Sequence, residues 1–561
     1  MINTVIFIIS FYILLFSTIG YGFIFNHLCF ERKENFDERN LIYIGFYGLF
    51  LITLISLLSS LVIAHNFTHN IIIHALGIIF LFLFKNKKKI YLKQIFYISI
   101  FVISALIISK THDDFSYYHL PFTKYLTEHK VIFGMGNLNH GYKFLSSLFF
   151  LNSVFYLPLI EYFSFHFTLG FVLIFFNYFI LREIYIAKNN EVIKYLYIFA
   201  FVFFNLSFNR IAEYGTDKIG QLLITLLIIK LFSIVCYNNK QLNLNRILYI
   251  VPLLALCISL KSYFLPYILL GFTILLLNKK ISEILSEIIL SKSFLFFLVL
   301  LSAYYFHHFI STGCIISPIS TTCFGEKFSW AIKKDEMLKL SIFLEQWAKA
   351  GAGPNFRVEN VSIYIQNFNW LPNWFEKYFL EKFIDQLGIL IVTFIFIFFL
   401  FKKFEFKKKN KILNLRIIFF YFLILLVFVI WLTNHPTLRY GGYPMIFLTL
   451  SIPISLFFSS IKNKNNFDNK VTFIILLVVV AFNIKNLTRI NSEFERNDQY
   501  KFSNFPFFAI VNKDFVKKEY DSGLNIYGAH HCWSTPTPCG HISNKIYVYK
   551  RNGFYFINKS E

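Results

Sequence analysis

The first 25 residues, MINTVIFIISFYILLFSTIGYGFIF, form an apolar run without a single acidic or basic side chain. A helix needs about 20 mostly apolar residues to cross the hydrocarbon core of a bilayer, so this run is long enough to span a membrane. It lacks the basic start of a signal peptide and is the first of many similar runs. We therefore interpret it as a retained membrane span.

The composition of the whole chain also indicates a membrane protein. Hydrophobic residues occupy 56% of the 561 positions and charged residues only 15%, far from the usage of soluble globular proteins. We predict an all-α polytopic membrane protein with about 14 transmembrane helices. The apolar runs behind this prediction lie near residues 2–25, 41–64, 70–84, 95–110, 162–181, 193–209, 219–237, 247–260, 262–278, 293–311, 386–401, 417–433, 444–460 and 471–485.

Lysine and arginine predict the orientation of these spans, because basic loops stay in the cytoplasm. The formal charge of +23 is mainly such a topology signal, and we find no basic aromatic surface that indicates nucleic-acid binding. The basic residues concentrate in alternate loops, near residues 31–39, 85–93, 182–194, 279–292, 402–416 and 462–470.

This orientation gives a domain organisation with three outer segments. We expect an N-terminal module of about three spans over residues 1–94 and a core over residues 95–311 that contains an outer loop, 111–160. A long extracytoplasmic loop over residues 312–385, further transmembrane helices over residues 386–485 and an extracytoplasmic tail over residues 486–561 complete the chain.

Four of the seven cysteines fall in these outer segments, as two close pairs. Cys314 and Cys323 lie in TGCIISPISTTCFG, and Cys532 and Cys539 lie in HHCWSTPTPCG. Because disulfides persist only in oxidising compartments, we predict a disulfide within each pair. A zinc site is the alternative for the second pair, since three histidines share its loop (His530, His531 and His541).

The outer segments carry further local signals. KIYVYKRNGFYFINK, residues 545–559, alternates polar and apolar side chains around Asn-Gly and predicts a β-hairpin. In the first outer loop, turn residues between two amphipathic stretches predict short helices along the outer membrane face. Four tryptophans of the long loop are either interfacial anchors, which we favour, or stacking surfaces for a sugar ring (Trp330, Trp347, Trp370 and Trp374).

Ionisable residues at membrane depth mark candidate functional positions, because charges are costly there. Asp113 and Asp114 are adjacent in THDDFSYYHLP, residues 111–121. Two neighbouring carboxylates repel each other, which favours a catalytic base over a structural role. The other candidates open to the same side: Glu213 and Asp217 in NRIAEYGTDKIG, Lys261 between two spans, and His435, Arg439 and Tyr440 in NHPTLRYGGYP.

Each candidate also has a purely structural interpretation. Asp114 and Asp217 could cap helices, and Arg439 could pair with an acid or extend to lipid headgroups. Three nearby histidines could contribute to metal binding or proton transfer, but we favour a role as interfacial hydrogen bonders (His112, His119 and His140).

An outer loop that begins with a carboxylate pair and continues with juxtamembrane helices resembles the GT-C superfamily of integral membrane glycosyltransferases. Three longer stretches together are similar to a bacterial family of multi-spanning proteins associated with surface polysaccharide: HDDFSYYHLPFTKYLTEHKVIFGMGNLNHGYKFLSSLFFLNSVFYLP, GCIISPISTTCF and PTLRYGGYP. One departure is that the acidic pair follows the fourth predicted span, whereas it follows the first span in the superfamily, so three additional spans precede it.

The resemblance implies a GT-C-like bundle and a transferase of the cell envelope. Asp113 or Asp114 would deprotonate the acceptor hydroxyl, and Glu213 and Asp217 would line the cavity. Arg439, together with Lys261, would face the donor phosphate. The resemblance leaves open whether a divalent metal, Mg²⁺ or Mn²⁺, binds at the acidic residues; if so, Asp113, Asp114 and Asp217 are the candidate ligands.

The implied partners are membrane lipids, a polyprenyl-phosphate-linked sugar donor and a glycan, lipid or protein acceptor. The implied location is the bacterial inner (plasma) membrane, with the site facing the periplasm or the exterior. An O-antigen-type polysaccharide polymerase is the alternative enzyme, and it would depend on cations more than on the acidic pair. A lipid-linked sugar flippase or other transporter would place polar residues throughout the spans and contain an internal repeat, which the sequence does not strongly show. A nonenzymatic scaffold is a further alternative.

Overall fold

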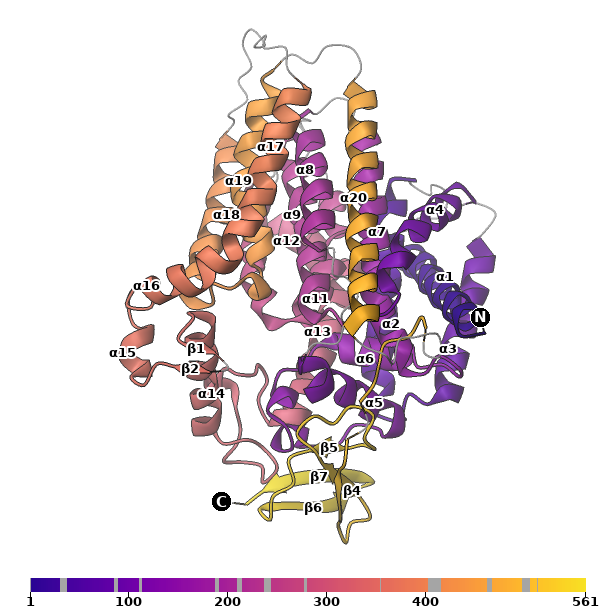
Figure 1. Ribbon diagram of the computed structural model, residues 1–561, viewed down its shortest axis with the longest axis vertical. Coiled ribbons are helices and arrows are strands. Elements are labelled where there is room, and N and C mark those ends of the chain that lie inside the picture. The colour runs from indigo at the N-terminus through magenta and orange to yellow at the C-terminus, as the bar shows by residue number, and fades with distance from the viewer. Residues whose placement is uncertain are drawn as a thin grey trace.

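The computed structural model describes residues 2–30, 38–84, 89–109, 113–186, 191–208, 214–236, 244–276, 280–353, 355–401, 415–461, 467–496, 505–511 and 513–560. These residues form a helical bundle with small sheets at one end (Figure 1). Among them, 11 helices are long and apolar enough to cross a membrane. The protein is therefore a polytopic helical membrane protein.

The N-terminal half of the chain supplies long helices and the short helices of the first outer loop. They are α1 (Ile2–Phe30), η1 (Glu38–Tyr43), α2 (Ile44–Ser59), α3 (Phe67–Phe84), α4 (Lys89–Leu106), η3 (Phe115–His119), α5 (Leu120–Glu128), η4 (Met135–Asn137), η5 (His140–Lys143), α6 (Ser147–Val154), η6 (Tyr162–His166), α7 (Phe167–Ile186), α8 (Glu191–Ser207), α9 (Thr216–Cys236), α10 (Leu244–Leu248), α11 (Val251–Leu260) and η7 (Ser262–Leu276).

The C-terminal half adds the second outer segment, the last long helices and the strands. They are α12 (Ile281–Ile289), α13 (Lys292–Thr312), η8 (Ser320–Thr322), α14 (Lys334–Ala348), β1 (Ala352–Gly353), β2 (Phe356–Arg357), α15 (Val361–Ile365), α16 (Leu371–Trp374), η9 (Phe375–Phe383), α17 (Ile384–Leu400), α18 (Leu415–Asn434), η10 (Leu438–Tyr440), α19 (Gly442–Ser459), α20 (Phe467–Arg496), β3 (Val516–Glu519), β4 (Asn525–Gly528), β5 (Cys539–Gly540), β6 (Ile546–Arg551) and β7 (Phe554–Lys559).

The predicted count of 14 spans is not confirmed, because three of the expected spans are shorter than the other eleven. α8 has 17 residues and packs against α7, α17, α19 and α20 inside the bundle. α11 and η7 are shorter apolar helices that meet at Lys261. Neighbouring helices shelter the backbone ends of such short elements, so they do not need the full length of a lipid-exposed span.

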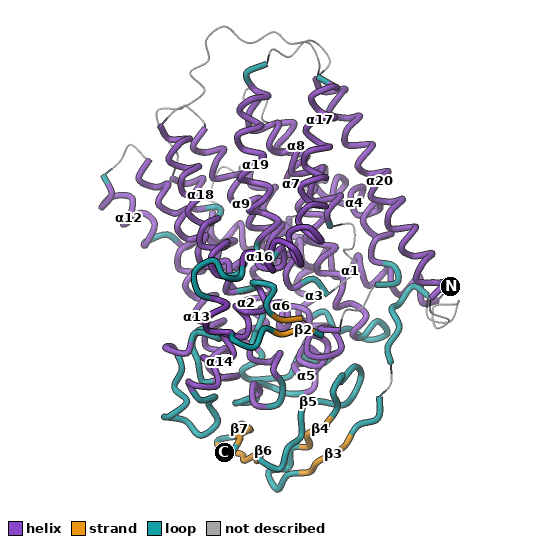
Figure 2. Tube along the Cα trace, turned by 60° about the vertical axis from the view of Figure 1, so that its left-hand side comes forward, coloured by secondary structure: helices purple, strands orange, loops and turns teal. Residues whose placement is uncertain are grey.

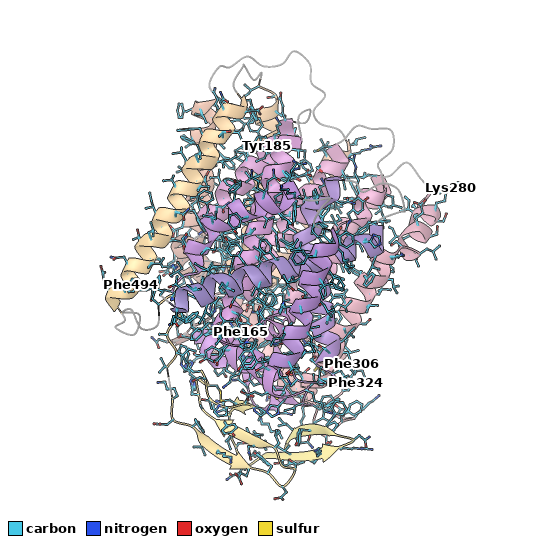
Figure 3. All side chains as sticks on the ribbon, turned by 90° about the vertical axis from the view of Figure 1, so that its right-hand side faces the viewer. Phe165, Tyr185, Lys280, Phe306, Phe324 and Phe494 are labelled. Atoms are coloured by element: carbon cyan, nitrogen blue, oxygen red, sulfur yellow. A yellow bond between two sulfur atoms is a disulfide. The ribbon has the colours of Figure 1, made fainter. Side chains whose placement is uncertain are left out.

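The three predicted outer segments gather at one end of the bundle (Figures 1 and 2). Phe133 of the first segment joins the C-terminal strands, because its N–H donates to the Tyr555 carbonyl and its own carbonyl accepts from Ile557, both over 2.9 Å. Lys143 of the same segment forms an ion pair of 2.5 Å with Glu336 of the second segment. Tyr185 and Lys280 lie toward the opposite end, away from the strands (Figure 3).

The C-terminal strands form two small antiparallel units with one parallel addition. β3 and β4 pair antiparallel and β5 joins β4 in parallel. β6 and β7 form the predicted hairpin, with Arg551 opposite Phe554 and both Asn552 and Gly553 at positive φ in the turn. Asn-Gly favours this turn because both residues tolerate positive φ, so the β-hairpin prediction is confirmed.

Both predicted disulfides are present. Cys314 pairs with Cys323, and Cys532 pairs with Cys539. The zinc alternative for the second pair is therefore wrong, since both thiols are used in the disulfide. Three further cysteines are free thiols (Cys29, Cys236 and Cys257).

Candidate functional site

Four ionisable side chains from four separate parts of the chain meet at the outer end of the bundle. The Arg439 guanidinium donates from Nη2 to Asp114 over 2.8 Å and from Nε to Asp217 over 2.9 Å. Lys261 Nζ lies 3.4 Å from the other oxygen of Asp217. Two carboxylates and two cations thus form a cluster whose formal charges cancel, and we call it the ionic cluster.

Each member of the ionic cluster stands where a helix begins or ends. Asp114 precedes the π-helical turn η3, and Asp217 lies in the first turn of α9, where the helix dipole favours negative charge. Lys261 is the extended residue between α11 and η7. Arg439 lies in the short helix η10, which ends at Gly441 with φ 93°. The breaks between helices therefore place charged side chains at membrane depth without interrupting a span.

The exposed fractions indicate that the ionic cluster is accessible on one side. The side chains of Asp217 and Lys261 are 16% and 13% exposed, whereas those of Asp114 and Arg439 are 26% and 34% exposed. Nη1 of Arg439 makes no hydrogen bond with any residue that the structure describes. One end of the guanidinium is thus available to an anionic ligand.

The backbone of Arg439 is held from inside the bundle. Its carbonyl accepts from the Tyr263 hydroxyl over 2.8 Å and from Gln221 Nε2 over 3.2 Å. The side-chain Oε1 of Gln221 in turn accepts from the Tyr443 N–H over 3.3 Å. Because α9 provides both Asp217 and Gln221, a single helix fixes the side chain and the backbone of Arg439.

Residues of the long segment 312–385 support the loop that carries Arg439. Trp374 Nε1 donates to the Pro436 carbonyl over 2.7 Å, and the Tyr378 hydroxyl accepts from the Leu438 N–H over 3.1 Å. Trp374, Trp370 and Trp330 are all buried within the protein. The suggestion that these three tryptophans stack on a sugar is therefore wrong, since their rings pack against protein.

The structure separates the two adjacent aspartates. Asp114 belongs to the ionic cluster, while the neighbouring Asp113 side chain is exposed and has no contact with Arg439. Asp114 is the residue that precedes η3 but makes no capping hydrogen bond with its side chain, so its contact with Arg439 is the feature that distinguishes it. Of the two adjacent aspartates, Asp114 is therefore the candidate that contacts another predicted site residue.

The remaining predicted site residues lie at the margin or outside the described part of the chain. The ring of Tyr440 packs at a tilt against that of Tyr263, with centroids 5.4 Å apart, and edge-to-face against that of His435, at 5.8 Å. Burial lowers the pKa of the His435 imidazole and raises the pKa of the Tyr440 phenol. Glu213 and His112 lie outside the described residues.

Three neighbours of the ionic cluster were not predicted as site residues. Gln221 and Tyr263 hold the Arg439 backbone, and His119 lies close enough to interact electrostatically with Asp114. Gln221 had a detectable signal, because it follows Asp217 by four residues and thus shares its face of an otherwise apolar helix. His119 was interpreted as an interfacial hydrogen bonder, but its ring is buried and stacks on Tyr214 at 4.8 Å.

His119 is a neutral imidazole beside charged groups. Burial lowers its pKa to about 3, while Asp114 acts in the opposite direction. Its Nε2 atom is buried and has no hydrogen-bond partner among the residues that the structure describes. The pKa of Arg439 shifts the other way, well above its ordinary value, because Asp217 lies beside the guanidinium.

The acidic residues do not fit a divalent metal. A Mg²⁺ or Mn²⁺ site needs several oxygen ligands that face one point. Asp114 and Asp217 instead contact the guanidinium of Arg439, and Asp113 is exposed. Among the described residues, no group of three or more His, Cys, Asp or Glu side chains could hold a metal ion.

Comparisons with known proteins identify the family of the chain. The model of a family described as "Domain of unknown function (DUF8201)" matches residues 4–446, and the chain belongs to this family. The matched region includes all four members of the ionic cluster and ends before α20. Neither the curated proteins nor the solved structures contain a match to the chain.

Proposed function

We propose that this member of the DUF8201 family is a membrane glycosyltransferase. It takes a sugar from a polyprenyl-phosphate-linked donor and transfers it to a surface glycan, lipid or protein acceptor on the extracytoplasmic face. The observation that carries the proposal is the bridge from Arg439 to both Asp114 and Asp217 at the outer end of the membrane bundle.

The chemistry requires a base near the acceptor hydroxyl and a counter-charge near the departing phosphate, so the contact between Asp114 and Arg439 has to open when the donor binds. In the proposed reaction, the acceptor hydroxyl gives its proton to the Asp114 carboxylate while its oxygen bonds to the anomeric carbon. The bond from that carbon to the phosphate oxygen breaks, and the phosphate leaves with the electron pair. A direct displacement of this kind inverts the anomeric centre.

Arg439 and Lys261 suit the departing phosphate. A guanidinium binds two phosphate oxygens at once, and Nη1 of Arg439 has no partner among the described residues. An incoming phosphate would draw Arg439 toward it and weaken the bond to Asp114, which makes that carboxylate more basic as the donor binds. The same residue thus links donor binding to the base.

The adjacent aspartates provide a matched test of the proposal. The gene is deleted and restored as wild type, Asp114→Asn, Asp113→Asn or Arg439→Ala, and membrane levels of the four proteins are equalised. Surface glycans and lipid-linked intermediates are then compared by mass spectrometry. We expect Asp114→Asn and Arg439→Ala to reproduce the deletion, with one sugar missing from the product, and Asp113→Asn to restore it.

Two other outcomes would replace the proposal. Normal glycan in Asp114→Asn together with short chains in Arg439→Ala would indicate an O-antigen-type polymerase, because that reaction depends on the cations. Complete lipid-linked product retained on the inner leaflet would indicate a flippase.

A further inference from the structure

The C-terminal segment lies outside the region matched by the family model, yet it contacts the turn that carries Asp114. Its disulfide loop, defined here as residues 530–541 and closed by Cys532–Cys539, packs on η3. His531 Nδ1 lies 2.9 Å from Ser116 Oγ, and the Trp533 N–H donates to the Ser116 carbonyl over 3.2 Å. Ser116 is two residues from Asp114, so this contact is close to the candidate base.

The direction of the His531 contact follows from hydrogen-bond capacity. The Ser116 hydroxyl donates its single proton to the Asp113 carbonyl over 3.1 Å. His531 therefore acts as the donor, through Nδ1–H. The rings of Phe115 and Tyr117 also approach the loop, with centroids 6.3 Å from Trp533 and 5.8 Å from His530, respectively.

The same loop is bound to α5, which continues from η3. Lys124 Nζ donates to the carbonyls of Ser534 and Thr535 over 2.7 and 3.2 Å. Glu128 accepts from both the N–H and the hydroxyl of Thr537, over 3.2 and 2.6 Å. The disulfide loop therefore holds the turn at its start and the helix along its length.

We propose that the disulfide loop is the positioning element of the candidate site, and that His531 acts through Ser116 to keep Asp114 directed at Arg439. A π-helical turn is uncommon and is maintained by its surroundings, so external contacts of this kind decide its geometry. Because disulfides persist only in oxidising compartments, the loop takes this form only on the outer side of the membrane. The contact by which the disulfide loop fixes η3 does not depend on the proposed function. The effect of that contact on catalysis rests on the proposed function.

Hydrogen exchange in lipid nanodiscs tests the hold directly. Peptides covering residues 113–129 are followed by mass spectrometry in wild type, His531→Ala and the Cys532→Ser/Cys539→Ser double variant. We expect exchange of residues 115–120 to rise roughly fivefold or more in both variants, because each loses hydrogen bonds that stabilise the turn. The matched control is Cys314→Ser/Cys323→Ser, which opens the other outer disulfide and is expected to exchange as wild type does.

A conservative replacement separates positioning from general destabilisation. Asn at position 531 keeps an N–H donor close to that of Nδ1, so His531→Asn is expected to restore both slow exchange and glycan yield where His531→Ala does not. Unchanged exchange in His531→Ala, or raised exchange with wild-type glycan yield, would overturn the inference. An Asp114→Asn variant with normal glycan would instead overturn the proposed function. The exchange measurement would still show whether the disulfide loop stabilises η3.

Discussion

Arg439 and Asp217 form an ion pair of 2.9 Å although 222 residues separate them in the chain. The same guanidinium reaches Asp114, which is 325 residues away. One side chain can serve both carboxylates because the N–H groups of arginine form a rigid planar fork. The three segments that carry Asp114, Asp217 and Arg439 are thereby fixed relative to one another.

Arg439→Lys is expected to break the bridge while keeping the charge. An ammonium group is a point charge on a flexible stem and cannot hold both carboxylates in the same geometry. We expect a loss of glycan product of at least tenfold but a loss of only about 1–2 kcal/mol of stability, since the site is partly exposed to solvent. Complementation and thermal unfolding in nanodiscs measure the two effects. Arg357→Lys, at an exposed position of the outer segment, is the control, and equal product from both variants would contradict the prediction.

Glu183 and Lys230 form an ion pair of 2.9 Å between α7 and α9. Their side chains are only 10% and 17% exposed, and Glu183 also accepts from the Tyr197 hydroxyl over 3.4 Å. Removing one partner, as in Lys230→Met, is expected to cost about 3–5 kcal/mol because it leaves an uncompensated charge.

The double variant Glu183→Gln/Lys230→Met is expected to recover most of that stability, since it removes both charges. Thermal unfolding of the single and double variants in nanodiscs gives the coupling directly. Additive losses in the double variant would show that the two residues act separately.

The lowered pKa of His119 predicts that the free energy of unfolding decreases in acid. Its pKa of about 3 in the folded protein lies below the ordinary value of 6.5, so the unfolded chain binds the proton first as the pH falls below 6.5. The contribution of neutral His119 to the free energy of unfolding is complete above pH 6.5, and it falls by about 2 kcal/mol when the pH is lowered to 5. The charged groups that act on this ring are Asp114, Asp217, Lys261 and Arg439.

His119→Phe isolates this effect, because a phenyl ring can still stack on Tyr214. The variant is expected to lose less stability between pH 7 and pH 5 than wild type does, whereas His530→Phe at an exposed position should behave as wild type. Chemical denaturation at the two pH values measures the difference. The same pH dependence in all three proteins would assign the acid sensitivity to other groups.

The four paired cysteines allow the predicted orientation to be tested without an activity assay. A membrane-impermeant maleimide added to intact cells is expected to label the outer cysteines only after mild reduction, because both pairs are disulfides. Mass spectrometry should then find label on Cys314, Cys323, Cys532 and Cys539. Label on these residues only after the cells are opened would reverse the orientation.

The local features of the fold were predictable because each depends on nearby residues. Long apolar runs identified the long spans, Asn552-Gly553 identified the hairpin, and short spacing identified the disulfide Cys314–Cys323. The span count exceeded the number of long helices because apolar runs in the sequence do not reveal that the helices α8, α11 and η7 are shorter than the other eleven.

The candidate site was predictable as a set of residues but not as an arrangement. Asp114, Asp217, Lys261 and Arg439 were all identified from charge at membrane depth, and the structure places them within one cluster. Gln221 and Tyr263 were missed because they act on the Arg439 carbonyl, and a backbone contact leaves no charge signal in the sequence.

The sequence by itself determined that the chain crosses the membrane many times, that charged side chains lie at the ends of apolar runs, and which cysteines can pair. These properties follow from hydrophobicity, charge and short spacing. Only the tertiary structure showed that Asp114 contacts Arg439, because this contact joins residues that are 325 positions apart in the chain. Contacts over such separations depend on how the helices pack, and packing is a property of the folded chain as a whole.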